Sequence, residues 1–242
     1  MKIDPEKCIS CQECIDICPV SAIVEGDDAT QIGQDDCVEC TECLKSEVCP
    51  VDAIYMPEES QKYPRLIRTL FSNPRAQWPR AIAGFGRGTQ EMKTNDVTGR
   101  YRRGEYGIGV EFGRPGMGTR ISEIEKVSTL LAQQPGVHFE EENPVIYLLM
   151  EDIKTGKIKP EFLQEKILSG ILEFSIKEDL LEEVLAKLLR VLETVDTVVS
   201  LALISRYAED GTLPVLEKLK QLGLSPRPNA KINLGLGRPF ID

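Results

Sequence analysis

All eight cysteines of this 242-residue chain lie within its first fifty residues, in two runs of similar spacing. The first run is Cys8-Ile-Ser-Cys11-Gln-Glu-Cys14-Ile-Asp-Ile-Cys18-Pro, and the second is Cys37-Val-Glu-Cys40-Thr-Glu-Cys43-Leu-Lys-Ser-Glu-Val-Cys49-Pro. Short loops of this kind aim several thiolates at one small metal core, which is typical of a [4Fe-4S] cluster. The two runs therefore predict two such clusters.

The ligands of each cluster follow from the pairing of the runs. In a two-cluster arrangement the fourth cysteine of each run ligates the cluster of the other run. The first predicted ligand set is Cys8, Cys11, Cys14 and Cys49, and the second is Cys37, Cys40, Cys43 and Cys18. Five residues separate Cys43 from Cys49, where three separate Cys14 from Cys18, so the second run has a longer loop.

Disulfides and structural zinc are the competing interpretations of these cysteines. A secreted disulfide-rich domain should follow a signal peptide, but Met1-Lys-Ile-Asp leads into the first run without an apolar segment. Structural zinc prefers well-separated CxxC pairs, whereas tandem CxxCxxC runs ending in Cys-Pro suit iron-sulfur clusters. We expect iron-sulfur.

Residues 1–57, with both complete runs, resemble a bacterial-type dicluster ferredoxin. The resemblance implies a one-electron carrier of low potential. Residues 58–104 are predicted to be an extended arm rich in Pro, Gly and Arg, and residues 105–242 a second domain. Apolar residues within the arm favour packing on its own C-terminal domain or on a partner subunit over a flexible tether.

Charge is unevenly distributed along the chain. Residues 1–57 carry thirteen acidic residues and three lysines, a net charge of −10, whereas residues 58–105 carry ten basic and five acidic residues, a net charge of +5. An acidic surface around a redox centre can steer a basic partner, although acidity also serves solubility. The overall acidity argues against nucleic-acid binding, and the short apolar stretches argue against a membrane span. We expect a cytoplasmic protein.

The glycine-rich segment 84–100 is a candidate anion site. Backbone amides of glycine-rich turns bind anions, and Arg87, Lys93 and Arg100 add positive charge. A flavin phosphate or CoA is therefore a candidate ligand, and a surface loop is the alternative. Residues from about Gly86 onward, especially Arg87 to Arg100 and the Gly-Arg-Pro sequences at 113–115 and 237–239, also resemble part of the 6-hydroxynicotinate reductase family. That resemblance implies ferredoxin-dependent reduction of a nitrogen heterocycle, with iron-sulfur and flavin centres.

Residues 105–242 predict an α+β fold. Hydrophobic periodicity predicts, in chain order, a strand, a helix, two strands, a helix, a strand, a short helix and a last strand. The ranges are 106–112, 119–134, 145–150, 168–176, 180–195, 198–205, a short helix beginning near Pro214, and 231–236. The first six elements fit a ferredoxin-like split βαβ sandwich, which the last two extend.

A Gly-Arg-Pro turn ends two of these strands. Arg114 and Gly116 follow the first strand and precede a helix, a geometry suited to an anion, while the alternative is plain strand termination. The single histidine, His138, provides no catalytic arrangement, and we assign no catalytic residue.

Three functions remain open. The first is an electron-transfer subunit that serves a dedicated partner oxidoreductase. The second is a component of a flavin- or ferredoxin-dependent reductase of a nitrogen heterocycle or enoate. The third is a sensor whose C-terminal domain binds a small molecule. The sandwich is also a candidate contact between two copies of the chain.

Overall fold

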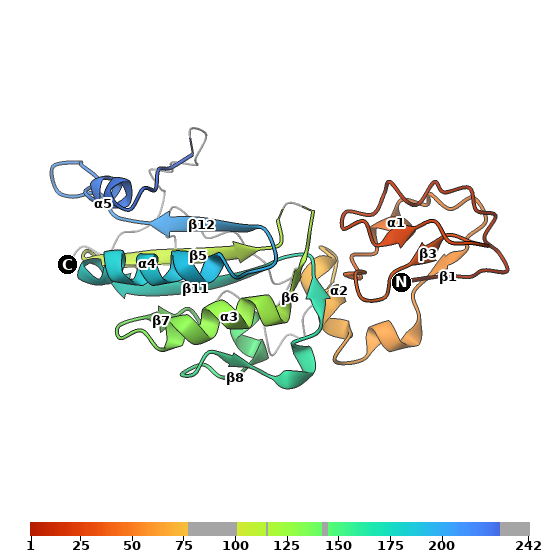
Figure 1. Ribbon diagram of the computed structural model, residues 1–242, viewed down its shortest axis with the longest axis horizontal. Coiled ribbons are helices and arrows are strands. Elements are labelled where there is room, and N and C mark those ends of the chain that lie inside the picture. Colours follow the sequence, from red (N-terminus) through yellow and green to blue (C-terminus); the bar gives the residue numbers. More distant parts are fainter. Residues whose placement is uncertain (77–100, 115, 142–144, 228–242) are drawn as a thin grey trace.

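The computed structural model describes residues 1–76, 101–114, 116–141 and 145–227, and has an α+β fold. Two parts lie side by side in Figure 1: the N-terminal part, residues 1–57, and the sheet part, which begins at residue 101. Helix α2 (Leu66–Ser72) lies between them. Within the described residues, no helix is long and apolar enough to cross a membrane.

The N-terminal part is built from short strand pairs and tightly wound loops. Strand β1 (Lys2–Ile3) pairs with β4 (Ile54–Tyr55), and β2 (Ile23–Val24) pairs with β3 (Gln31–Ile32), all antiparallel. Its core contains buried aliphatic side chains together with Cys14, Cys37 and Cys43. Helix α1 (Glu42–Lys45) begins just before Cys43 and runs into the longer loop of the second cysteine run.

The two cysteine runs share one backbone pattern. Left-handed φ angles occur at matching positions of the two runs, in residues other than glycine that adopt this conformation only rarely. The matching pairs are Ser10 (53°) with Glu39 (55°), Gln12 (65°) with Thr41 (64°), and Ser21 (52°) with Asp52 (50°). The sequence repeat is therefore also a structural repeat.

The start of the arm is helical, so the prediction of an extended arm is wrong there. A 3-10 helix, η1 (Glu58–Gln61), is followed by α2. Ile67, Leu70 and Phe71 recur at helical spacing and are buried in the core of the sheet part. Burial of a side chain such as Phe71 contributes about 1.5–3 kcal/mol. This section of the arm packs on the chain's own sheet part, as expected for a packed arm.

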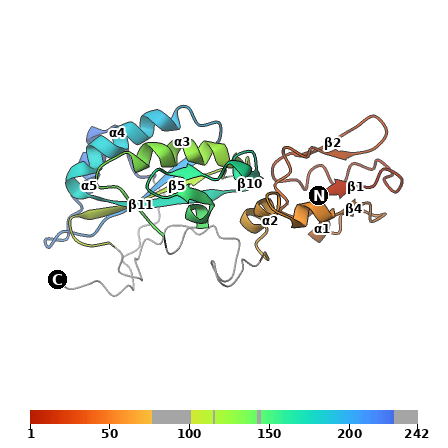
Figure 2. The ribbon, with the colours of Figure 1, turned by 90° about the horizontal axis from the view of Figure 1, so that it is seen from below.

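The sheet part contains a four-stranded antiparallel sheet in the order β12-β5-β11-β7. These strands are β5 (Glu105–Phe112), β7 (His138–Phe139), β11 (Gly170–Lys177) and β12 (Val199–Ile204). Helices α3 (Ile121–Ala132) and α4 (Leu181–Leu192) cover one face (Figure 2). The predictions of three strands and two helices are confirmed.

One predicted strand is wrong. Residues 145–149 form a 3-10 helix, η2 (Val145–Leu149), in which Ile146 and Leu149, three positions apart, are buried. This spacing matches the three residues per turn of a 3-10 helix. Because all five residues of the segment are apolar, the sequence pattern alone does not reveal this period. The second strand of the sheet along the chain is instead β7.

Smaller elements complete the described chain. Strand β6 (Thr119–Arg120) pairs with β10 (Lys166–Ile167), and β8 (Met150–Asp152) pairs with β9 (Lys157–Ile158). The remaining elements are η3 (Pro160–Phe162), η4 (Glu178–Leu180) and α5 (Val215–Gln221), the last being the predicted short helix. The predicted last strand, residues 231–236, lies outside the described residues.

Candidate metal centre

The structure brings the eight cysteines together in two groups of four, each around its own cavity. One cavity is lined by Cys18, Cys37, Cys40 and Cys43, and we call it the inner cavity. The other is lined by Cys8, Cys11, Cys14 and Cys49, and we call it the outer cavity. Each cavity takes three cysteines from one run and the fourth from the other run, in the two sets that the sequence predicts as ligands.

The remaining walls of both cavities are mostly apolar. Ile23, Ile32 and Val38 are among the residues that line the inner cavity, and Ile3, Val48 and Ile54 are among those that line the outer one. Apolar walls exclude water from a metal centre and so influence its redox potential. Within the described residues, no group of three His, Cys, Asp or Glu side chains is arranged to hold a single metal ion.

The chemistry of the cysteines fits an iron-sulfur cluster. All eight are free thiols. The amide nitrogen of Ala22 donates a hydrogen bond of 3.2 Å to the Sγ atom of Cys18, and that of Ala53 donates one of 3.2 Å to Cys49. The repeat thus supplies each cavity with an N–H donor to its fourth sulfur, an interaction that tunes cluster potentials.

Burial strongly affects the acidity of several thiols. It raises the pKa of Cys14, Cys37 and Cys40, and it raises the pKa of Cys43 to about 12. Hydrogen bonds from the backbone at Ser10 lower the pKa of Cys8 instead. Iron binds the thiolate form, so metal binding must displace protons from these buried thiols.

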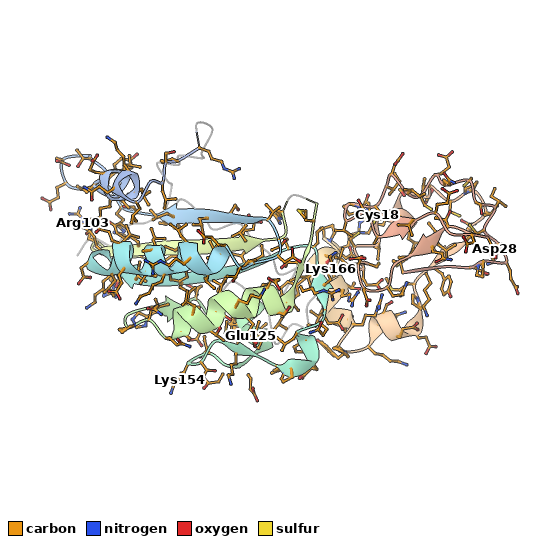
Figure 3. The ribbon with its side chains drawn as sticks, in the orientation of Figure 1. Cys18, Asp28, Arg103, Glu125, Lys154 and Lys166 are labelled. Atoms are coloured by element: carbon orange, nitrogen blue, oxygen red, sulfur yellow. The ribbon has the colours of Figure 1, made fainter. Side chains whose placement is uncertain are left out.

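The two cavities differ in their access to solvent. The outer set contains the exposed Cys11 and one buried cysteine, Cys14, whereas the inner set contains two buried cysteines, Cys37 and Cys43, and no exposed one. In Figure 3, Cys18 lies on the side of the N-terminal part nearer the sheet part, and Asp28 lies at the opposite end. The inner cavity therefore faces the rest of the chain.

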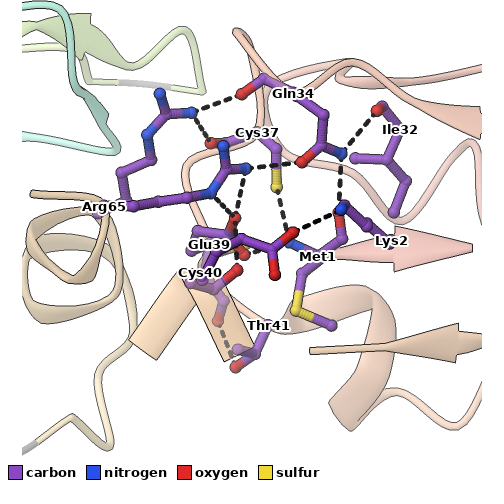
Figure 4. Close-up of polar contacts among 12 residues, drawn as sticks. Met1, Lys2, Ile32, Gln34, Cys37, Glu39, Cys40, Thr41 and Arg65 are labelled. Atoms are coloured by element: carbon purple, nitrogen blue, oxygen red, sulfur yellow. Dashed lines mark hydrogen bonds and ion pairs between the residues drawn. The ribbon is translucent and has the colours of Figure 1, made fainter. Parts of the chain in front are cut away.

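A buried ionic network lies beside the inner cavity (Figure 4). Glu39, between two cysteines of the second run, is fully buried and binds the amino group of Met1. Arg65 donates a hydrogen bond of 2.8 Å to Oε1 of Glu39 and one of 2.9 Å to the side-chain oxygen of Gln34. Burial alone raises the pKa of Glu39, but these two cations outweigh it, so its pKa lies below the usual range.

The sequence interpretation assigned no site role to Glu39, Arg65 or Arg68. The signal that was available is the excess of arginine in the arm, directly after an acidic N-terminal part. Arg65 and Arg68 come from the arm and contact residues of the second cysteine run. Complementary charge thus joins the two segments.

Gly116, one residue of the predicted anion site, and Gly118 lie close to residues that line the inner cavity. Gly116 and Gly118 have left-handed φ angles of 69° and 70°. A Cβ atom on Gly116 would lie 3.1 Å from the carbonyl oxygen of Pro19, and one on Gly118 would lie 3.4 Å from a methyl group of Val38. Since Pro19 follows Cys18 of the inner set, Gly116 lets the two parts approach closely at this point.

Arg114, the other described residue of that prediction, makes contacts within the sheet part. Its guanidinium lies 3.0 Å from Oε1 of Glu111 and donates a hydrogen bond of 3.3 Å to the hydroxyl of Ser169. Arg87 and Lys93 lie outside the described residues. Binding of a flavin or another anion by Arg87, Lys93, Arg114 and Gly116 stays a prediction.

Known proteins match the N-terminal part. The 4Fe-4S binding domain family matches residues 1–24. Ferredoxin 7Fe of Hydrogenibacillus schlegelii is 40% identical over 72 residues, which cover 90% of that ferredoxin and 27% of this chain. The chain belongs to the ferredoxin family. A ferredoxin of Alicyclobacillus acidocaldarius subsp. acidocaldarius is 40% identical over 65 residues, covering 81% of its length and 25% of this chain.

A ferredoxin of Rickettsia felis is 37% identical over 51 residues, covering 45% of its length and 20% of this chain. These relatives confirm a 4Fe-4S ferredoxin domain and electron transfer through it. The matches of all three ferredoxins cover about a quarter of the chain or less. The resemblance of the later residues to 6-hydroxynicotinate reductases stays a hypothesis.

Proposed function

We propose that this ferredoxin carries single electrons through two [4Fe-4S] clusters, to or from a dedicated partner oxidoreductase. The observation that supports this most directly is the crossed lining of two separate cavities, each by four cysteines. A bound [4Fe-4S] cluster supplies one-electron redox chemistry. The chain's own residues hold the cluster, exclude water from it and provide N–H donors to sulfur.

The outer cavity is proposed to exchange electrons with a basic external partner. Two exposed acidic residues lie near Cys11: Glu13 is two positions along the chain, and Glu25 accepts a hydrogen bond of 2.8 Å from the adjacent Gln12. The carbonyl oxygen of Asp28 accepts one of 3.1 Å from the hydroxyl of Ser10. This face therefore presents negative charge beside the exposed Cys11. Negative charge there favours fast, salt-dependent association with a basic surface on the partner protein.

The sheet part is proposed to connect the ferredoxin to that oxidoreductase. Its β12-β5-β11-β7 order and its two helices on one face fit the split βαβ topology, an architecture that many contact and ligand-binding domains share. In this proposal residues 1–57 form the cluster domain, residues 58–104 the arm and residues 105–242 the contact domain. A contact between two copies through the sheet part belongs to the same proposal.

The number and kind of metals test the proposal. Protein purified without oxygen should contain about eight iron and about eight sulfide ions per chain, as two [4Fe-4S] clusters require. About seven iron, the number in the name of the Hydrogenibacillus relative, would contradict two complete [4Fe-4S] clusters. About four iron, or stoichiometric zinc, would contradict the proposal.

The reductase and sensor alternatives make different predictions. A flavin that remains after the clusters are bleached would favour a component of a nitrogen-heterocycle or enoate reductase. A spectral change on adding a small molecule, without an electron acceptor, would favour the sensor. Electron transfer to an acceptor with neither of these signals favours the proposed function.

A further inference from the structure

Arg68 is a buried cation that connects the inner cavity to the sheet part. It lies on α2 and is 5% exposed. Its Nη1 atom donates hydrogen bonds of 2.7 Å to the carbonyl oxygen of Gln34 and 2.8 Å to that of Cys37, while its Nε atom binds the carboxylate of Glu165. One side chain thus holds the start of the second cysteine run against the segment before β10.

Two further lysine side chains connect the second cysteine run to α2 and to the sheet part. Lys166 donates a hydrogen bond of 2.8 Å to Asp36, which precedes Cys37. Lys45 donates a hydrogen bond of 2.7 Å to Asn73, which follows α2, and one of 3.4 Å to the carbonyl oxygen of Cys40. The second cysteine run is therefore fixed to α2 and to the sheet part at several points.

The charge of Arg68 is weakly screened because the side chain is buried. A positive charge near a cluster favours the reduced state, which carries one more negative charge than the oxidised state, and screening weakens this effect for exposed groups. Glu165, 9% exposed, offsets part of the charge. Arg68 and Glu165 should therefore shift the potential of a nearby cluster in opposite directions.

We propose that Arg68 is a positioning residue for the inner cavity. It fixes the loop of Gln34 and Cys37 against the sheet part, and its buried charge raises the reduction potential of the inner cluster while leaving the outer cluster unchanged. The inference rests on the proposed function, since it requires a cluster in each cavity. The inference also assigns different roles to the two clusters. The outer cluster exchanges electrons with the external partner, and Arg68 and the sheet part set the reduction potential of the inner cluster.

The experiment is a potentiometric titration of the full, iron-loaded chain followed by electron paramagnetic resonance. Arg68→Met should lower the potential of one cluster, and Glu165→Gln should raise the potential of the same cluster. Cys40→Ser and Cys11→Ser assign the two signals, because each perturbs only the cluster of its own cavity. Arg103→Met is the control, since Arg103 forms an exposed ion pair with Glu209 far from both cavities and should change neither potential (Figure 3).

A structural role without tuning gives a different pattern. If Arg68 acted only by packing, Arg68→Met and Glu165→Gln would loosen the same contact, and the potential would stay unchanged or shift in the same direction in both. Either result overturns the inference, as does a shift of the outer cluster alone. If Arg68→Met holds no iron, Glu165→Gln decides, because it leaves the buried charge of Arg68 without its carboxylate partner and should raise the potential of the inner cluster; an unchanged or lowered potential overturns the inference.

Arg68→Lys separates position from charge. A lysine keeps the positive charge but lacks the planar guanidinium group, with which arginine binds two carbonyl oxygens and a carboxylate at the same time. The inner potential should stay closer to that of the unaltered chain than in Arg68→Met, while the thermal midpoint falls. The metal count separates failure of the proposed function from failure of this inference. Fewer than two clusters in the unaltered chain would refute the proposed function. Two clusters whose potentials do not change in Arg68→Met and Glu165→Gln would refute the role of Arg68 alone.

Discussion

Arg65 donates a hydrogen bond of 2.8 Å to the fully buried carboxylate of Glu39. Arg65 belongs to the arm and Glu39 to the second cysteine run, so the basic arm turns back onto the acidic N-terminal part. Arg68 makes the same connection one helical turn later. The opposite charges of these two segments therefore have a structural role in addition to any role in solubility.

Arg65→Met should destabilise the chain by about 3 kcal/mol, because it leaves the buried carboxylate of Glu39 with the amino group of Met1 but without its arginine partner. Thermal unfolding followed by circular dichroism measures the effect. Arg103→Met, which breaks an exposed ion pair with Glu209, is the matched control and should cost less than about 1 kcal/mol. Equal effects of the two variants would contradict the buried network.

Phe71→Ala should cost about 3–5 kcal/mol, because Phe71 is fully buried in the core of the sheet part and its removal leaves a cavity. Chemical unfolding followed by the helical signal measures this cost. Leu216→Ala, at a position that is 45% exposed, should change stability by less than about 0.5 kcal/mol. A small effect at Phe71 would show that α2 does not pack on the sheet part.

Tyr106 should make stability depend on pH in the alkaline range. Burial, and then the hydrogen bond of 2.8 Å to Glu178 with its negative charge, raise the pKa of Tyr106 above its usual value. A raised pKa in the folded state stabilises the chain below the usual tyrosine pKa of about 10, and this contribution is lost as pH rises toward the folded value. The stability difference between the unaltered chain and Tyr106→Phe should therefore shrink above pH 10 or so. A constant difference would contradict this.

Gly118→Ala should destabilise the chain more than Gly211→Ala. Both glycines have left-handed φ angles, so each substitution costs about 1–2 kcal/mol in backbone strain. A Cβ atom at Gly118 would also lie 2.9 Å from the carbonyl oxygen of Ile167, whereas one at Gly211 would meet no atom within 4 Å. Thermal midpoints measure the difference, and equal losses would show that the close approach at Gly118 is absent.

Periodicity predicted the main strands and helices of the sheet part, but it missed α2. Pro64 and Pro74 on either side, and the arginines between them, made residues 58–76 resemble a linker. The spacing of Ile67, Leu70 and Phe71 was the available helical signal. The 3-10 helix at residues 145–149 was missed because a wholly apolar segment does not distinguish a strand from a helix.

The cysteine spacing predicted the membership of both four-cysteine cavities, because short loops constrain where their thiolates point. The neighbours of the cavities could not be predicted in the same way. Arg68 and Glu165 are far apart in sequence, and only the packing of α2 against the sheet part brings them together. Contacts of this kind depend on tertiary structure that local patterns do not encode.

A series of four cysteine-to-serine variants tests whether each cluster is held by three cysteines of one run and the fourth cysteine of the other. Each iron-loaded variant is reduced and its two cluster signals are compared by electron paramagnetic resonance. If the cavities bind crossed clusters, Cys18→Ser perturbs the same signal as Cys40→Ser, and Cys49→Ser perturbs the same signal as Cys11→Ser. If Cys18→Ser instead perturbs the same signal as Cys11→Ser, each run holds its own cluster and the account is contradicted.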